Sequence, residues 1–118
     1  MKITGIDTFM SWVDWCNWLL VRISTDEGVC GWGEASLHGA IESVATAVRE
    51  YGAQLIGQDP AGPEQHWHRL YNSWRWRGGA VFMSALSALD LAPVSYTHLP
   101  AHRPDAPPGA AIAIRCTR

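Results

Sequence analysis

The chain has few cysteines, no long hydrophobic run and no signal-peptide pattern, and each absence excludes a class of protein. Its three cysteines, Cys16, Cys30 and Cys116, are an odd number without CxxC spacing, which indicates neither a disulfide framework nor a zinc site. No apolar stretch reaches the length that crosses a bilayer, and Met1-Lys2 leads directly into a strand pattern. We therefore expect a cytoplasmic protein without a membrane partner.

Charged residues are also sparse, at 17% of the chain with a formal net charge of −2. The arginines are scattered among acidic residues and form no basic stripe that could follow a phosphate backbone, so nucleic acid is not an expected partner. Tryptophan, in contrast, is abundant: seven among 118 residues. This supplies enough apolar area for one modest domain that folds without disulfides.

The sequence best defines a β-hairpin around the polar turn at residues 26–28. Residues 18–24 alternate between apolar and polar side chains and predict a half-buried strand. Its buried face is expected to hold Leu19, Val21 and Ile23. After the turn, Gly31 and Gly33 leave a flat surface that other backbone can approach closely. Residues 2–12 predict a further strand, so the three form an antiparallel meander.

Three helical patterns follow the predicted sheet. The first ends at Gly57 and buries one face, comprising Ile41, Val44, Ala45, Val48, Leu55 and Ile56. The second begins at Pro63 and has an aromatic face of Trp67, Leu70, Tyr71 and Trp74. The third begins after Gly79 and buries Phe82, Ala85, Leu86 and Leu89, beside the small residues Ser84, Ser87 and Ala88. The sequence therefore predicts an α+β fold of three strands followed by three helices.

Three motifs in this order resemble one protein family. They are TDEGVCGWGEAS at residues 25–36, LIGQDP at 55–60 and WRGGAVFMSALSALDLA at 76–92. Together, residues 1–92 resemble the N-terminal capping domain of the enolase superfamily, in its mandelate racemase and muconate lactonizing branch. Within that branch they are most similar to sugar-acid dehydratases of the galactonate dehydratase kind.

The resemblance implies a cap that lies over the mouth of a TIM-type barrel and gives the active site its walls and lid. The chemistry of the family is proton abstraction α to a carboxylate, with the enediolate stabilised by Mg²⁺. The three carboxylate ligands and the lysine or histidine base belong to the barrel. The matched region therefore holds no catalytic residue and no metal ligand, and Glu34 is expected to have a structural role. The full-length parent would bind a sugar acid and is expected to form a homo-oligomer.

The resemblance also points to substrate contacts in two loops of the cap. In the first, residues 12–17, an apolar wall comprises Trp12, Trp15 and Cys16, and Asp14 could meet a substrate hydroxyl or a cation. In the second, which follows the third strand, Ser36 and His38 are candidate contacts, and His38 is the best single one. Two simpler interpretations compete with these roles: the loop tryptophans pack on the sheet, and the histidine is only solvated.

The sequence changes character at Pro93. Residues 93–118 hold five of the seven prolines, one acidic residue and no periodic pattern. Residues 94–102 also resemble, at all but one position, a translated reading frame of a transposase-derived sequencing adapter. We therefore expect two parts: a capping domain at 1–92, and a proline-rich tail at 93–118 that is non-native, through frameshift or adapter read-through. The alternative is a genuine proline-rich linker.

The sequence also allows a second function. The chain could be a free-standing binding or interaction module with a tryptophan-rich surface. A module of that kind should cover its apolar area, whereas a cap without its barrel should expose a patch that promotes self-association. Any affinity of the isolated cap for a sugar acid should be poor, because the metal and most polar partners of the carboxylate would be missing.

Overall fold

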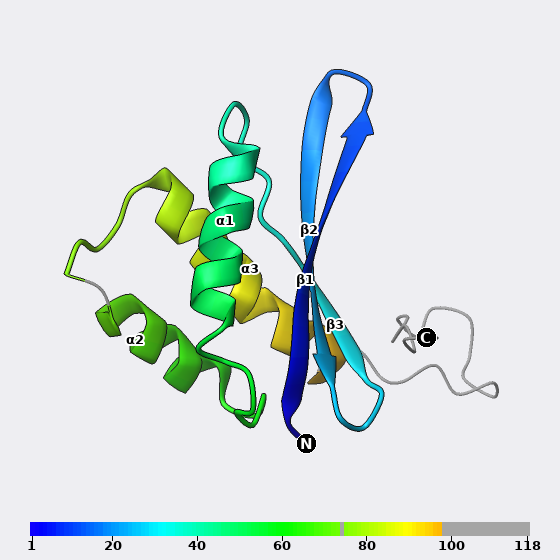
Figure 1. Cartoon of the computed structure of the whole chain (residues 1–118), viewed down its shortest axis with the longest axis vertical. Helices are drawn as coiled ribbons and strands as arrows, with labels where there is room; N and C mark the ends of the chain where they lie inside the picture. Colours follow the sequence, from blue (N-terminus) through cyan, green and yellow to red (C-terminus); the bar gives the residue numbers. More distant parts are fainter. Residues whose placement is uncertain (74, 98–118) are drawn as a thin grey trace.

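The computed structural model describes residues 1–73 and 75–97, which form a sheet covered on one face by helices (Figure 1). The strands are β1 (Ile3–Val13), β2 (Cys16–Thr25) and β3 (Cys30–Glu34). The helices are α1 (Ile41–Gly52), α2 (Pro63–Ser73) and α3 (Ala80–Thr97). The strands are antiparallel in the order β1-β2-β3, which confirms the predicted meander and the α+β class. Within these ranges, no helix has the length and apolar character needed to span a membrane.

Strand β2 lies in the middle of the sheet and contributes its predicted face to the core. Leu19, Val21 and Ile23 are fully buried beneath the helices. On the opposite face, Arg22 of β2 pairs in register with Asp7 of β1 and with Trp32 of β3. The alternation read from the sequence therefore predicted correctly which side chains face the helices.

Gly33 confirms the expected close approach of another backbone. A Cβ atom built on Gly33 would lie deep inside van der Waals contact with the backbone carbonyl of Ala88 in α3. Ala88 is itself fully buried at this contact. A strand glycine and a helix alanine thus allow α3 to rest directly on β3, as the residue types suggested.

Helix α1 is shorter than the sequence predicted. It ends at Gly52, and turns bonded from Leu55 N–H to Gly52 O and from Gln58 N–H to Leu55 O follow it. Leu55 is buried from this turn as expected, but Ile56 is 44% exposed, so its predicted place in the core is wrong. Gly52 has low helix propensity and packs closely against Ile6, which favours a helix end at this point.

Helices α2 and α3 meet through the aromatic residues that the sequence singled out. Leu70 is the buried residue of α2, and Trp67 stacks on Tyr71 with ring centroids 4.8 Å apart. Phe82 of α3 lies against Tyr71 of α2, with ring centroids 6.1 Å apart, and it also meets Tyr51 of α1 edge to face at 5.1 Å. The start of α2 at Pro63 and of α3 after Gly79 are both as predicted. Trp74 lies outside the described residues.

Helix α3 runs past the expected boundary at Ala92. It continues through Pro93 to Thr97, so the expectation that the irregular tail begins at residue 93 is wrong for residues 93–97. Pro93 removes one helical hydrogen bond, but its side chain is fully buried. Ser95 Oγ donates a hydrogen bond to Ala92 O and accepts one from the backbone N–H of Trp32, each at 2.8 Å. The second bond connects this last turn of α3 to β3. The rest of the predicted tail, 98–118, lies outside the described residues.

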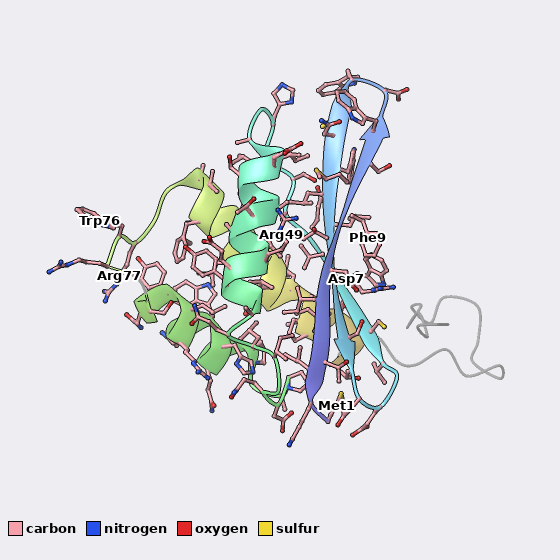
Figure 2. All side chains as sticks on the ribbon, in the orientation of Figure 1. Met1, Asp7, Phe9, Arg49, Trp76 and Arg77 are labelled. Carbon is pink, nitrogen blue, oxygen red and sulfur yellow. The ribbon has the colours of Figure 1, made fainter. Side chains whose placement is uncertain are left out.

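The sheet face away from the helices is apolar and partly exposed. This outer face comprises Phe9, Trp18, Leu20 and Trp32, with Arg22 among them. The Arg22 guanidinium lies over the Phe9 ring, 5.1 Å from its centroid, and is 2.6 Å from Asp7 Oδ2 (Figure 2 labels Phe9 and Asp7). The apolar sheet face expected of a cap without its barrel is therefore present.

Candidate functional site

A pocket of about 400 Å³ lies where the β1–β2 hairpin meets the loop before α1. Figure 1 shows these two segments at the same end of the molecule, away from the N-terminus. We call it the cap pocket, and its walls are Trp12, Trp15, Asn17, His38, Gly39, Ala40, Ile41, Glu42 and Ser43. It combines aromatic surface with hydrogen-bonding groups from three elements of the chain, as small-molecule sites do.

The hairpin is tighter than the loop expected at residues 12–17. β1 and β2 pair as far as Val13 and Cys16, which leaves only Asp14 and Trp15 in the turn. Asp14 has a φ of 53°, the sign that the first residue of a type II′ turn requires. Trp12 and Trp15 are 77% and 83% exposed. These two tryptophans therefore do not pack on the sheet, and that simpler interpretation is wrong for them.

The loop that carries His38 is anchored to β2 at its start. The Ala35 N–H donates to Leu19 O at 2.8 Å, and the Leu19 N–H donates to Ser36 Oγ at 3.0 Å. The chain then turns through Gly39, at a φ of 78°, into α1. This anchor leaves His38 exposed on the pocket wall.

Helix α1 presents its N-terminal end to the pocket. Ala40 occupies the N-cap position and provides no side-chain hydrogen bond. The first N–H groups of a helix have no intrahelical partner, and within the described residues none is found for the N–H groups of Ile41, Glu42 and Ser43. Glu42 places a carboxylate in this first turn. The helix end therefore offers the pocket both donors and an acceptor.

The structure separates the four predicted contacts into two groups. Trp15 and His38, from different loops, lie together on the pocket wall, whereas Asp14 is exposed in the turn and is absent from that wall. Ser36 is also off the wall, and its hydroxyl accepts a backbone N–H. Substrate binding by all four stays a prediction.

Sequence reasoning missed two polar residues of the pocket, Asn17 and Glu42. Asn17 Oδ1 is shut off from solvent and receives no hydrogen bond from the described part of the chain. The sequence held one indirect signal for Glu42, which lies in the first turn of α1. Ala40 precedes this helix where a serine, threonine or aspartate cap is usual, so the first turn is left uncapped. Nothing in the sequence marked Asn17, because its importance depends on the hairpin register.

The metal that the resemblance implies does not fit these residues. In the ranges 1–73 and 75–97, no three His, Cys, Asp or Glu side chains cluster closely enough to hold a metal ion. Glu34 is the last residue of β3, and its side chain is exposed. No catalytic step through a metal can be assigned to the described part of this chain.

Asp90 carries the one carboxyl group among the described residues with a clear pKa shift. It lines a small pocket between α2 and α3 with Glu64, Trp67 and His68. Partial burial, and then repulsion from the Glu64 carboxylate, raise the pKa of Asp90 above its ordinary value. This pocket opens between the helices and shares no residue with the cap pocket.

The meander, the helices packed on it and a pocket at the sheet end define the class of an α+β capping domain. Residues 4–95 match the family described as mandelate racemase / muconate lactonizing enzyme, N-terminal domain. The chain belongs to this family.

Two curated relatives and one solved structure are representative of the similarity. The chain is 42% identical over 92 residues to D-galactonate dehydratase of Variovorax paradoxus and 45% identical to that of Verminephrobacter eiseniae. Each alignment covers 78% of this chain and 23% of the relative. An enolase from Pantoea ananatis, solved with bound D-gluconate and Mg, superposes with a TM-score of 0.74 at 36% identity. That superposition covers 78% of this chain and 23% of the other.

These comparisons decide between the two functions that the sequence left open. The chain spans 23% of the length of the curated relatives it matches, and the matched part is their N-terminal domain. The alternative of an independent tryptophan-rich binding module is therefore not supported. The exposed tryptophans are features of a cap domain.

Proposed function

We propose that this chain is the capping domain of a sugar-acid dehydratase that acts on galactonate or a close relative. The observation that carries the proposal is the match to D-galactonate dehydratases over 92 residues, at 42% identity in one case. The cap pocket supports it, because aromatic walls with a few polar groups suit a polyhydroxylated carbon chain. The reaction itself would belong to the barrel of the full-length protein.

In this proposal the cap contributes binding and exclusion of water. Contacts with the part of the substrate away from the reacting carbons can help to orient and distort it at the site of chemistry. Trp12 and Trp15 would form the apolar wall that closes over the substrate, and His38 would contact a hydroxyl. Closure also removes water, which strengthens the electrostatic interactions inside the site.

The remaining partners are part of the same proposal. Mg²⁺ would be held by carboxylates of the barrel and would stabilise the enediolate formed by proton loss α to the carboxylate. The D-gluconate and Mg bound to the Pantoea enolase support both the substrate class and the metal. We also propose a homo-oligomeric, cytoplasmic parent. Cell fractionation and sedimentation of the full-length protein would check these two points.

A fusion tests the proposal. Residues 1–92 of this chain would replace the matched segment of Variovorax paradoxus D-galactonate dehydratase, which supplies the rest of the enzyme. We expect Mg²⁺-dependent loss of water from D-galactonate, measured as the keto-deoxy acid formed. The relative's own full-length enzyme is the positive control, and its barrel without any cap is the negative control. A fusion that has the circular dichroism spectrum of the parent but no turnover would contradict the proposal.

A further inference from the structure

We infer that the free edge of β1 is an interface, at which β1 pairs antiparallel with β1 of a second copy of this chain. The two copies would be related by a two-fold axis at Phe9, and their meanders would join into one continuous sheet. The inference goes beyond the proposed function, because it requires neither a barrel nor a substrate. It also differs from association through the outer face, which this pairing leaves uncovered.

The direction of the backbone groups along β1 follows from Leu19 in the middle strand. The Leu19 N–H donates to Ser36 Oγ and its C=O accepts from the Ala35 N–H, so both groups point toward the β3 side. Its register partner Met10 therefore makes no ladder bond with Leu19 and turns its own N–H and C=O away from β2. This direction alternates along a strand. The residues that point outward in this way are Ile6, Thr8, Met10 and Trp12.

These four residues leave a row of backbone groups without partners. In the ranges 1–73 and 75–97, no hydrogen bond is found to their outward N–H and C=O groups. Ile3 is different, because its N–H donates to Gln58 O at 3.0 Å and its C=O accepts the Gly57 N–H at 2.8 Å. Past the irregularity between Ile3 and Gly5, Figure 1 shows no helix in front of β1. An extended strand is the partner that matches alternating donors and acceptors along an edge.

The sequence of this edge has none of the features that usually keep strand edges apart. Residues 6–12 contain no proline and no lysine, and their register with β2 is regular. Asp7 is the one charged residue among them, and Arg22 of β2 pairs with it on the outer face. The aromatic and β-branched residues of this segment favour extended structure. The edge of β1 is therefore open to another strand.

The backbone of β1 is complementary to itself in one antiparallel register. A two-fold interface must bring the same surface of both copies together. With the axis at Phe9, Ile6 would pair with Trp12 of the second copy, and Thr8 would pair with Met10 of the second copy. Outward groups then face outward groups at every one of these pairs, and each pair exchanges two hydrogen bonds. This register pairs all the outward residues with one another.

The side chains fit the same register. Phe9 would lie opposite Phe9 of the second copy, as an aromatic cross-strand pair on the outer face. Asp7 would lie opposite the uncharged Ser11 of the second copy. An axis at Asp7 would also join outward groups, but it would place two carboxylates directly opposite each other, which is destabilising. Charge therefore favours the axis at Phe9.

Disulfide trapping tests the inference on the full 118-residue chain. The two copies of position 9 would form a non-hydrogen-bonded pair with Cα atoms about 4.5 Å apart, which a disulfide can bridge. Each variant also carries Cys16→Ala, so that the introduced thiol is the one cysteine of the tryptic peptide 3–22. With oxidised glutathione as the oxidant, Phe9→Cys should give the disulfide-linked dimer of this peptide, measured by mass spectrometry.

Trp18→Cys is the matched control. Trp18 is 42% exposed and Phe9 is 40% exposed, and both lie on the outer face. Trp18 belongs to β2, however, and three strand spacings would keep it at least about 14 Å from its counterpart in the second copy. Phe9→Cys should therefore yield at least about fivefold more linked peptide than Trp18→Cys. Equal yields from the two variants, or no linked peptide from Phe9→Cys, would overturn the inference.

Amide exchange gives a second readout, which needs no substitution. The N–H groups of the four outward residues should exchange with deuterium at least about fivefold more slowly as dimers form at higher protein concentration. The N–H groups of residues 7, 9 and 11 already face β2 and should show no such change. Protection at the outward residues that does not depend on concentration would mean that a segment of the same chain covers the edge. That result would also overturn the inference.

A proline identifies the edge itself. The outward N–H of Met10 makes no bond within the chain, so Met10→Pro should leave the pairing of β1 with β2 intact and abolish trapping through Phe9→Cys. Met10→Val changes the same side chain but keeps the N–H, and should retain trapping. Circular dichroism checks that each variant is folded. A folded Met10→Pro chain that is still trapped would contradict the inference, whereas an inactive fusion would refute only the proposed dehydratase.

Discussion

At the scale of single residues, Gly33 shows how one missing side chain sets the distance between the two layers. A Cβ at this position would collide with the backbone carbonyl of Ala88, and backbone cannot move aside as a flexible side chain can. We predict that Gly33→Ala destabilises the chain by about 2 to 3 kcal/mol, the scale of overpacking in a core. Urea denaturation followed by tryptophan fluorescence measures this.

Gly5→Ala is the matched control. Gly5 is also a strand glycine, and a Cβ there would meet no atom within 4 Å. Its substitution should change stability by less than about 0.5 kcal/mol. Equal losses for the two variants would show that α3 does not rest on β3 in the way described.

His38 and Ser36 lie two residues apart in one loop, but we expect substitutions at the two positions to have different effects. Ser36 accepts the Leu19 N–H, so its role here is to hold the loop. His38 is exposed on the pocket wall and has no such structural partner among the described residues. In the active fusion, His38→Ala should lower kcat/KM for galactonate about tenfold, with thermal stability unchanged. His68→Ala, on α2 and off the pocket wall, should leave kcat/KM as it was.

At the scale of elements, Asp90 of α3 is partly buried beside Glu64 of α2, and burial first, then the Glu64 charge, raise its pKa. Its raised pKa means that the folded state holds the proton more tightly than the unfolded state, whose pKa is about 3.9. The contribution of the Asp90 carboxyl to the free energy of unfolding is fully present below the unfolded pKa. It is lost as the pH rises through the folded pKa. Asp90→Asn should therefore raise the Tm at pH 7 and have little effect below about pH 3.5.

Thermal denaturation at several pH values checks this prediction. Glu50→Gln, an exposed carboxylate on α1, serves as the control and should show no such pH-dependent gain. An Asp90→Asn variant that is less stable at pH 7 than at pH 3.5, relative to the parent chain, would contradict the raised pKa that burial, and then the charge of Glu64, give Asp90.

The elements also show where sequence patterns succeed and where they fail. The alternation of Leu19, Val21 and Ile23 specified the buried face of β2, because a strand must place alternate residues on one side. The end of α1 was misplaced because helical periodicity continues through Leu55, while the chain there forms turns. The end of α3 was misplaced because Pro93 usually stops a helix, and its burial against the fold is a tertiary effect.

The candidate site was predictable only in part for a similar reason. The family resemblance pointed to two loops, and the pocket brings Trp15 and His38 from these loops together. Asn17 and Glu42 were not found, since their relation to the pocket depends on the register of β1 with β2 and on the direction in which α1 begins. Local patterns specify elements, whereas a pocket depends on how the elements meet.

At the scale of the whole molecule, the outer face of the sheet is the feature with the largest consequence. Phe9 and Trp18 are 40% and 42% exposed there, beside Leu20 and Trp32. An apolar face of this kind promotes association when nothing covers it. We predict that the isolated chain self-associates at micromolar concentration and binds a hydrophobic dye, as light scattering and fluorescence would show.

One pair of variants locates that association. Trp18→Lys should weaken it at least fivefold, because it places a charge in the outer face. Trp76→Lys, at a tryptophan that is 84% exposed in the segment between α2 and α3, should have little effect (Figure 2). A parent chain that remains monomeric at high concentration without binding the dye would contradict the account of the outer face.

The central claim is that this chain caps a barrel that carries the chemistry. A long sequencing read of the gene across the codons for residues 90–102 tests it most directly, because the expected non-native tail begins in that interval. We predict that the genomic frame continues from Leu91-Ala92 into a barrel with three carboxylate metal ligands and a lysine or histidine base. Genomic codons that reproduce residues 93–118 and then stop would contradict the claim.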